Sequence, residues 1–579
     1  MDNSEAGSNL SLERASRITS VTLVALAVVI LALSFVGTGE RLTGILAFTE
    51  DLVLVPIVLV GLVLARGWAK SAGGWPNNAG YWVAGLIAFV LIAGWAGHYL
   101  VFDGYDLSRD EQMATFDTAI FRDGRLFAPI PAAWRPVADA LNLTFMLPMG
   151  ARESWVSAYL PIHAAWRAAV SLVADPALAS PLMAAFGGFC MWRIARLLWP
   201  ASAATQFVCV LLYAGSAQIV VTAMTAFSMS MHLALNLLWL WLFLLDRRRT
   251  HAAAMLVGWF ATGIHQPLFH PMFVAPFLLL LLTQKRWKLL AAYTVAYALI
   301  GMFWLAWPVW LSAQASSAAL PVSGTPGISF LDRLLSILHV PTLNSLWLTA
   351  ANLLRLICWQ HLLLVPLAIV GLRSSFREQP LGRALAFSFA LPIIVAALLL
   401  PWQGYGWGYR YVHPALGSLI LLGGYGWHAL ETRGLDLRPM MARASLFAIV
   451  LLIPICAVMG HRLAAPVAHL HRGIASTAAD IVIVDTAGLP YADDLVVNRA
   501  DLSNRPIMLL GYALEPEDLT TVCSLGSVAF VPGPRLAPLA RHFRADPPLR
   551  ASPHFVQLVA HARAARCRLV SSPNPSERN

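Results

Sequence analysis

Long apolar runs alternate with short polar segments over most of the chain. Runs of about 20 apolar residues are long enough to cross the hydrocarbon core of a bilayer. They centre near residues 28, 57, 91, 190, 211, 235, 260, 277, 300, 363, 392, 420 and 451. The pattern predicts an all-α polytopic membrane bundle of about 13 transmembrane helices. We expect a tail at residues 1–20 and a membrane domain at residues 21–460.

Basic residues recur in every second short loop. Examples are Arg14 with Arg17, Arg193 with Arg196, and the run Arg247 to Arg249, whereas the intervening short loops are nearly free of charge. Lysine and arginine are retained on the cytoplasmic side of a membrane. The pattern therefore predicts a multi-pass protein of a bacterial inner membrane, with its N-terminus cytoplasmic and its C-terminus periplasmic.

Three longer loop or tail segments face outward in this topology. The first is residues 103–178, whose apolar piece at residues 155–173 is interrupted by His163 and Arg167. We expect this piece to form helices at the membrane surface. The second, residues 312–343, is rich in Ser, Ala, Pro and Gly and is a candidate lid over an outer cavity. The third is the tail at residues 461–579.

The tail predicts a small periplasmic α/β domain. Apolar runs of β type lie at residues 480–485, 506–511 and 527–532, separated by turn-rich or helical segments. Cys523 and Cys567 lie in this polar tail, whereas the other four cysteines lie in apolar runs. Whether Cys523 and Cys567 form a disulfide stays open, and such a bond requires a tail outside the cytoplasm.

Composition narrows the class of protein. With 58% hydrophobic and 12% charged residues, the chain needs lipid as its main solvent. The net charge of +10 arises from short clusters between apolar runs, which are topology signals and not a nucleic-acid surface. The chain lacks the Walker A, His-Glu-x-x-His and Gly-x-Ser-x-Gly patterns, so nucleotide-driven transport, zinc proteolysis and serine hydrolysis lose their usual support.

The first outer segment contains an acidic pair, Asp110 and Glu111, directly after Arg109. A carboxylate at the membrane rim can deprotonate an acceptor hydroxyl, and its neighbour can orient it or bind a cation. The alternative is that the pair only caps the helix that follows.

A second polar cluster lies between Pro401 and Pro414 and includes Trp407, Tyr409 and Arg410. Arginine binds phosphate bidentately, and the surrounding glycines permit tight turns. The alternative is an aromatic belt at the interface with a snorkelling arginine.

His265 and His270 lie at the outer turn between two closely spaced runs. No third ligand is evident near them, so hydrogen bonding to a lipid phosphate or another span is favoured over metal ligation. We assign no metal ligand, and a divalent cation stays open as a cofactor.

The order of these motifs resembles that of the GT-C superfamily of membrane glycosyltransferases, which includes protein O-mannosyltransferases and the lipid A aminoarabinose transferase. The resemblance covers most of residues 80–460. Two features depart from relatives: the acidic loop follows the third apolar run and not the first, and Tyr-Leu-Pro-Ile replaces Tyr-Pro-Pro-Gly. The resemblance rests on the acidic pair Asp110 and Glu111, on Tyr159-Leu-Pro161-Ile-His163, on Asp175 to Pro181, and on a run ending at Arg193-Ile-Ala-Arg196.

The resemblance implies a polyprenyl-phosphate sugar donor and a glycan, lipid or protein acceptor at the outer face of the membrane. It implies inverting transfer with Asp110 as general base and Glu111 as its partner. The remaining expected substrate-binding residues are Arg410, Tyr409, Trp407, His265, His270 and Arg109.

Two other functions stay open. A transporter or flippase of lipid-linked glycans would have charges buried inside spans and two similar halves, whereas the ionisable groups of this chain are expected at the outer rim. A ligase or polymerase acting on lipid-linked glycans would rely on arginine and histidine in a large late outer loop. The early acidic loop favours the transferase.

Overall fold

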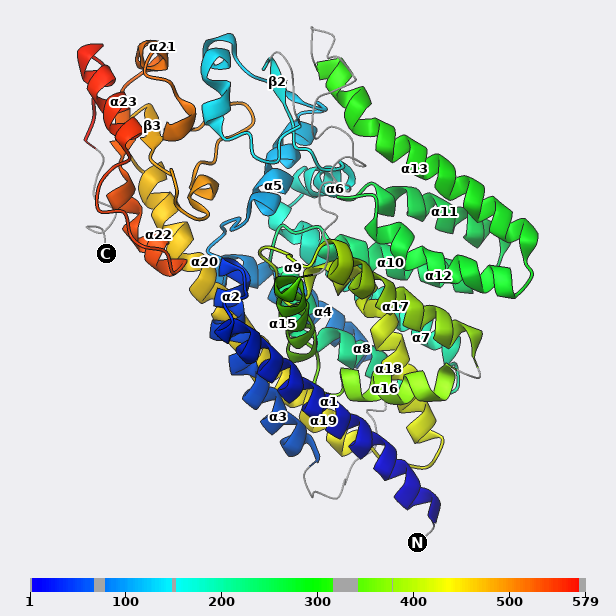
Figure 1. The fold of residues 1–579 in the computed structure, drawn as a ribbon. Coiled ribbons are helices and arrows are strands. Elements are labelled where there is room, and N and C mark those ends of the chain that lie inside the picture. Colours follow the sequence, from blue (N-terminus) through cyan, green and yellow to red (C-terminus); the bar gives the residue numbers. More distant parts are fainter. Residues whose placement is uncertain (1–2, 67–78, 148–151, 316–341, 377–378, 572–579) are drawn as a thin grey trace. The chain divides into compact units, whose positions relative to one another are not determined.

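The structure, a computed structural model, describes residues 3–66, 79–147, 152–315, 342–376 and 379–571 (Figure 1). The chain divides into two compact units. The membrane unit comprises Met1–Gly97, Ala177–Trp304 and Arg333–Met459, and the loop-and-tail unit comprises His98–Pro176, Leu305–Asp332 and Gly460–Asn579. Most of the predicted lid at residues 312–343 lies outside the described residues.

The membrane unit is built from helices. Within the described residues, seven helices are long and apolar enough to cross a membrane, or eight if the bent pair α8 and α9 counts as one span. The elements are α1 (Asn3–Phe35), α2 (Arg41–Leu46), the π-helix η1 (Ala47–Asp51), α3 (Leu52–Arg66), α4 (Ala79–Leu100), α7 (Ala179–Leu198), α8 (Ala203–Ala214), α9 (Ala217–Ala223), α10 (Met229–Leu244), α11 (Arg248–Thr262), α12 (Phe269–Thr283), α13 (Trp287–Ala315), α15 (Leu343–Cys358), α16 (Leu364–Ser375), α17 (Pro380–Leu399), the 3-10 helix η4 (Arg410–Ala415), α18 (Leu416–Glu431), α19 (Arg438–Phe447), the π-helix η5 (Ala448–Leu452) and α20 (Ile453–Ala475).

The predicted apolar runs all overlap helices of this unit. Several of these helices are short, however: α10, α12, α15 and α16 have between 10 and 17 residues. The mostly helical membrane fold is therefore confirmed, and the count of 13 spans stays a prediction.

Glycines let helices α16 and α18 approach closely. A Cβ on Gly371 would lie 1.8 Å from the carbonyl oxygen of Leu422, and one on Gly426 would lie 2.0 Å from that of Leu367. Small residues at such positions allow backbone-to-backbone packing, which is the main source of helix association where both surfaces are apolar.

An ion pair is buried inside the membrane unit. Arg355 of α15 donates from Nε and Nη2 to the carboxylate of Asp51 at 2.7–3.1 Å, and both side chains are fully enclosed. Trp359 Nε1 also donates to Asp51. Glu50, the residue directly before Asp51, is buried as well. The expectation that ionisable groups gather only at the outer rim is therefore wrong. The signal was present in the sequence, since Glu50 and Asp51 interrupt an apolar run.

The loop-and-tail unit contains a three-stranded parallel sheet. Its strands are β3 (Ile481–Val484), β4 (Ile507–Leu510) and β5 (Val528–Val531), in the order β4-β3-β5. All three coincide with the β-type runs predicted from the sequence. The remaining elements are α5 (Arg109–Arg122), β1 (Ala128–Pro129), the 3-10 helix η2 (Ala132–Leu141), β2 (Ser154–Trp155), α6 (Ile162–Ser171), the 3-10 helices η3 (Pro176–Leu178), η6 (Ala492–Leu495), η7 (Gly511–Ala513) and η8 (Gly533–Leu536), α21 (Asp518–Leu525), α22 (Ala537–His542) and α23 (Pro553–Ala564).

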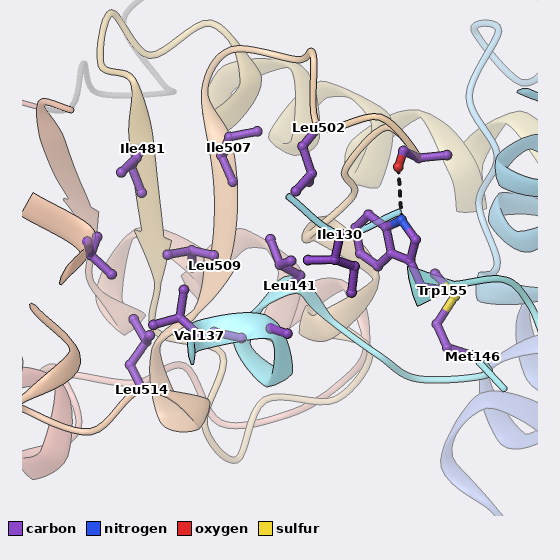
Figure 2. Packing of buried hydrophobic residues seen from close by; sticks show 14 of the residues in the cluster. Ile130, Val137, Leu141, Met146, Trp155, Ile481, Leu502, Ile507, Leu509 and Leu514 are labelled. Carbon is purple, nitrogen blue, oxygen red and sulfur yellow. Dashed lines mark hydrogen bonds between the residues drawn. The ribbon is translucent and has the colours of Figure 1, made fainter. Parts of the chain in front are cut away.

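One hydrophobic core joins the outer segment of residues 103–178 to the tail. Ile130, Val137 and Leu141 pack against Ile507 and Leu509 of the sheet region (Figure 2). The indole Nε1 of Trp155 donates to the carbonyl of Ala500 at 2.9 Å, drawn as the dashed line in Figure 2. The outer segment is therefore part of the folded tail region, although about 300 residues separate the two in the sequence.

Cys523 of α21 and Cys567 form a disulfide with a Cα–Cα distance of 5.2 Å. The sequence left this pairing open, and the structure decides it. The other cysteines, Cys190, Cys209, Cys358 and Cys456, are free and buried.

We expect the single substitution Asp51→Asn to destabilise the protein by about 3–5 kcal/mol, because it leaves the buried Arg355 guanidinium without the carboxylate to which it donates. The double variant Asp51→Asn with Arg355→Met should recover most of this loss, since the guanidinium that lost its partner is removed as well. Thermal unfolding in detergent measures the effect. Asp436→Asn is the matched control, because Asp436 pairs with Arg438 at 2.6 Å on the exposed surface, where such pairs contribute about 0–1 kcal/mol. Equal melting of Asp51→Asn and wild-type protein would contradict the assignment.

Replacing both Cys523 and Cys567 by serine should lower the stability of the loop-and-tail unit by about 4 kcal/mol, the loop-entropy value for a separation of 44 residues. Limited proteolysis with and without reductant measures this. The variant and the reduced wild-type protein should be cleaved equally fast, and both faster than the oxidised protein. If reductant left the rate of proteolysis of the wild-type protein unchanged, the prediction would be contradicted.

Candidate functional site

Helix α5 begins with a capping box. Ser108 Oγ accepts from the backbone N–H of Glu111 at 3.3 Å, and the Glu111 carboxylate accepts from the Ser108 N–H and hydroxyl at 3.1 and 2.9 Å. Glu111 is buried. The capping alternative of the sequence analysis therefore describes Glu111, whose role as a catalytic partner stays a prediction.

Asp110 lies in the first turn of the same helix and is half-buried. Its Oδ1 accepts a hydrogen bond from the hydroxyl of Tyr159. The N-terminus of a helix carries a partial positive charge that stabilises a carboxylate. The hydrogen bond from Tyr159 fixes the orientation of the Asp110 carboxylate.

Arg109 is buried, and its guanidinium donates three hydrogen bonds within the protein. Its Nε donates to the carbonyl of Thr144 at 3.1 Å, its Nη1 to Gln112 at 3.2 Å, and its Nη2 to the carbonyl of Asn142. We interpret Arg109 as a residue that positions the start of α5, while its predicted role as a substrate ligand stays a prediction.

The 3-10 helix η6 of the tail lies against the start of α5. Gln112 Nε2 donates to the carbonyl of Asp494 at 2.9 Å, and Asn142 Nδ2 donates to that of Asp493 at 2.7 Å. Burial raises the pKa of Asp494 to about 7; Arg109 opposes this rise, and the negative charges of Asp493 and Asp110 add to it. Asp494 is thus an acid electrostatically coupled to Asp110. Sequence reasoning missed it, although adjacent aspartates in a turn after a strand were a visible signal.

In the membrane unit, glutamine side chains next to breaks between helices hold the backbone around Tyr409, in the segment before α18. Gln218 Nε2 donates to the carbonyl of Tyr409 at 2.8 Å, and its Oε1 accepts from the Tyr409 N–H at 3.2 Å. Gly408, at φ +72°, passes so close that an added Cβ would lie 2.4 Å from Gln218. Gln360 Nε2 also donates to Gln218 Oε1, at 2.8 Å. Irregular backbone inside a membrane domain needs partners of this kind.

Arg410 follows directly in this segment and is buried. Its backbone N–H donates to Gln403 Oε1 at 2.9 Å and its Nη1 to the carbonyl of Tyr405 at 3.0 Å. The guanidinium lies 5.0 Å from the ring centroid of Phe227. Trp407 is also buried, with its ring centroid 6.3 Å from that of Trp359. The structure thus brings Trp407, Tyr409 and Arg410 into one ordered turn.

His270 is fully buried, and both ring nitrogens have partners: Nδ1 with Asn236 Oδ1 and Nε2 with the Tyr297 hydroxyl, each at 2.7 Å. These contacts favour hydrogen bonding of His270 to other helices over hydrogen bonding to a lipid phosphate. His265 is half-buried. In the part of the chain that the structure describes, no group of three or more His, Cys, Asp or Glu side chains is placed to hold a metal ion.

The candidate residues form two groups, Arg109, Asp110 and Glu111 in the loop-and-tail unit and Trp407, Tyr409 and Arg410 in the membrane unit. Residues within each group lie together. That Asp110 and Arg410 share one pocket stays a prediction.

The fold of this chain occurs among solved structures. It is similar to the crystal structure of ArnT from Cupriavidus metallidurans bound to undecaprenyl phosphate, with a TM-score of 0.51, 12% identity, and coverage of 75% of this chain and 86% of ArnT. ArnT is the lipid A aminoarabinose transferase, a GT-C enzyme. This chain therefore shares its fold with ArnT.

ArnT from the same organism in the apo state gives a TM-score of 0.49 at 12% identity, over the same shares of the two chains. No protein-family model matches the chain, and no curated protein matches it. The fold expected from the acidic loop and its flanking segments is therefore confirmed by the solved structure, without support from sequence identity.

We expect the stability of the loop-and-tail unit to fall as pH rises from about 4 to about 7. An aspartate with a raised pKa of about 7 binds its proton more tightly in the folded state than in the unfolded state, where the pKa is about 3.9. Stabilisation by protonation is therefore complete below pH 4 and lost above pH 7. Asp117, whose pKa burial also raises to about 7, acts in the same direction.

The variant Asp494→Asn should melt at a temperature that depends less on pH between 5 and 8 than that of the wild-type protein. The exposed Glu517→Gln is the matched control and should retain the full dependence. An unchanged pH dependence in Asp494→Asn would show that Asp494 is ionised at neutral pH.

Proposed function

We propose that this protein is an integral membrane glycosyltransferase that moves a sugar from a polyprenyl-phosphate donor to an acceptor at the periplasmic face. The observation that carries the proposal is Asp110, held by Tyr159 at the start of α5, in a chain with the GT-C fold. The donor class is supported by ArnT, which was solved with undecaprenyl phosphate bound. The periplasmic location of the site is supported by the disulfide of the same unit, because disulfides persist outside the reducing cytoplasm.

In the proposed reaction, Asp110 accepts the proton of an acceptor hydroxyl as that oxygen attacks the anomeric carbon of the donor sugar. The bond between the anomeric carbon and the phosphate oxygen breaks, and the lipid phosphate leaves as an anion. Attack opposite to the leaving group inverts the configuration at the anomeric carbon. No covalent sugar–enzyme bond forms, so a single base is sufficient.

The Tyr159 hydroxyl donates to Oδ1 of Asp110 and orients the carboxylate, which is the proposed proton acceptor. Arg410 is the proposed ligand of the leaving phosphate, since a guanidinium binds phosphate bidentately. Its position over the Phe227 ring restricts the directions in which the guanidinium can face. Charge on the leaving group is thereby stabilised where it develops.

Asp110→Asn should lower turnover by about 10²- to 10⁴-fold, because an amide cannot accept the proton. The assay follows loss of a polyprenyl-phosphate sugar by purified protein in detergent, using mass spectrometry. Glu517→Gln, which removes an exposed carboxylate of the same unit, is the matched control and should retain the wild-type turnover. Equal turnover by Asp110→Asn and wild-type protein would remove Asp110 as the base.

The same preparation tests the alternative of a flippase, which the buried pair of Asp51 and Arg355 favours because charges inside spans mark transport pathways. A flippase would move the lipid-linked sugar between leaflets of proteoliposomes and leave it chemically intact. A transferase consumes the donor.

A further inference from the structure

A chain of hydrogen bonds connects three helices of the membrane unit and ends at the segment that contains Arg410. The Tyr297 hydroxyl of α13 bonds Nε2 of His270 at 2.7 Å, and Nδ1 of His270, on α12, bonds Oδ1 of Asn236 at 2.7 Å. Asn236, on α10, donates from Nδ2 to the carbonyl of Pro414 at 2.9 Å. Pro414 is part of η4, the 3-10 helix whose first residue is Arg410.

The chemistry of the groups gives this chain one direction. A carbonyl oxygen can only accept, so the Asn236 amide presents its nitrogen to Pro414 and its oxygen to His270. Nδ1 of His270 is then the donating nitrogen, and in a neutral imidazole this leaves Nε2 to accept from the Tyr297 hydroxyl. Asn236 and His270 are fully buried, so a bond lost at either one leaves a polar group without a partner.

The bond at Pro414 complements the bonds at the other end of η4. Gln218 holds the backbone of Tyr409, directly before η4, and Gln403 Oε1 accepts from the Arg410 N–H. Pro414 lies four positions after Arg410, about 8 Å at 2.0 Å per residue of a 3-10 helix. Because the internal hydrogen bonds of a short 3-10 helix have poor geometry, the position of η4 depends on contacts from outside.

A second histidine–tyrosine pair in the same group of helices ends at a different place. Nδ1 of His251, on α11, bonds the Tyr293 hydroxyl of α13 at 2.9 Å, and its Nε2 bonds Oδ1 of Asp246 at 2.9 Å. Asp246 is exposed. The rings of Tyr293 and Tyr297 stack with centroids 6.4 Å apart, and in the described part of the chain no hydrogen bond joins them. This pair is therefore a control with the same chemistry and no connection to η4.

We propose that Asn236 and His270 are positioning residues for Arg410. Through the Pro414 carbonyl they fix η4, and thereby the direction in which the Arg410 guanidinium meets a lipid phosphate. The inference rests on the proposed function, in which Arg410 binds the phosphate of the donor. It assigns neither Asn236 nor His270 a contact with substrate. His270, expected from the sequence to bind substrate, acts here through the protein backbone.

Hydrogen exchange tests the hold on η4 without any substrate. Full-length protein in phosphatidylcholine nanodiscs is labelled and digested, and exchange is followed in peptides that cover residues 407–418. His270→Leu and Asn236→Leu should each speed exchange there on the order of tenfold, because the donor at the Pro414 carbonyl is released or removed. His251→Leu is the matched control and should exchange at the wild-type rate in this segment. Wild-type exchange in both His270→Leu and Asn236→Leu would overturn the proposal.

Binding of undecaprenyl phosphate tests the consequence for Arg410. The lipid is titrated into the same nanodiscs. His270→Leu and Asn236→Leu should bind it about tenfold more weakly than the wild-type protein, and His251→Leu should bind it equally well. Because the effect passes through Arg410, adding His270→Leu to Arg410→Gln should cause no further loss of affinity. A further loss, or equal weakening in His251→Leu, would indicate a general loss of structure and overturn the proposal.

Two amide variants separate the two ring nitrogens of His270. The amide nitrogen of an asparagine side chain can lie near the position of Nδ1, and that of glutamine near the position of Nε2. His270→Asn should therefore keep a donor to Asn236 and bind undecaprenyl phosphate within about twofold of the wild-type affinity. His270→Gln should bind as weakly as His270→Leu. The reverse order of affinities would contradict the assigned direction of the chain and overturn the proposal.

Failure of the proposed function has a different signature. If the wild-type protein neither binds undecaprenyl phosphate nor consumes donor, Arg410 is not a ligand of the donor phosphate. Hydrogen exchange then still decides whether Asn236 and His270 hold η4. If the wild-type protein binds the lipid and the His270→Leu and His251→Leu variants behave alike, the proposed donor stands and the positioning role is rejected.

Discussion

The loop-and-tail unit depends on a row of hydrogen bonds from side chains of the outer segment to backbone carbonyls of the tail. Gln112 binds the carbonyl of Asp494, Asn142 those of Asp493 and Val496, and Trp155 that of Ala500. Buried carbonyls need partners, and here these partners come from a segment about 350 residues earlier in the chain. The bonds fix the start of α5, and with it Asp110, against η6.

This constraint has an electrostatic consequence. It encloses Asp494 near Arg109 and Asp110, so the site contains two interacting carboxyl groups and one buried guanidinium. Groups that interact in this way titrate together, and protonation of one stabilises the anion of the other.

The membrane unit also contains irregular backbone whose polar groups need hydrogen-bond partners. Where helices break, at Gly215 and Ser216 and again after Cys358, glutamine side chains bind each other and the backbone of Tyr409. Lipid supplies no hydrogen-bond partners, so irregular segments are tolerated only with internal ones. The turn that bears Arg410 is ordered for this reason. The same low polarity makes it costly to remove one partner of the Asp51–Arg355 pair, because the other is then left buried without its hydrogen-bond partner.

The sequence by itself determined the membrane class, the helical character of each apolar run and the three strands of the tail, whereas the pairing of Cys523 with Cys567 was decided by the structure. These features follow from local hydrophobic pattern and from the chemistry of the residue types. It also singled out Asp110, since an acidic pair where the chain leaves an apolar run is visible without a fold. Only the tertiary structure separated Glu111 as a capping residue from Asp110, because both satisfy the same local pattern. Only it placed Asp494 beside α5, and only it paired Asp51 with Arg355. These contacts join positions hundreds of residues apart, and no periodicity in the chain encodes which distant carbonyl or carboxylate a side chain will meet.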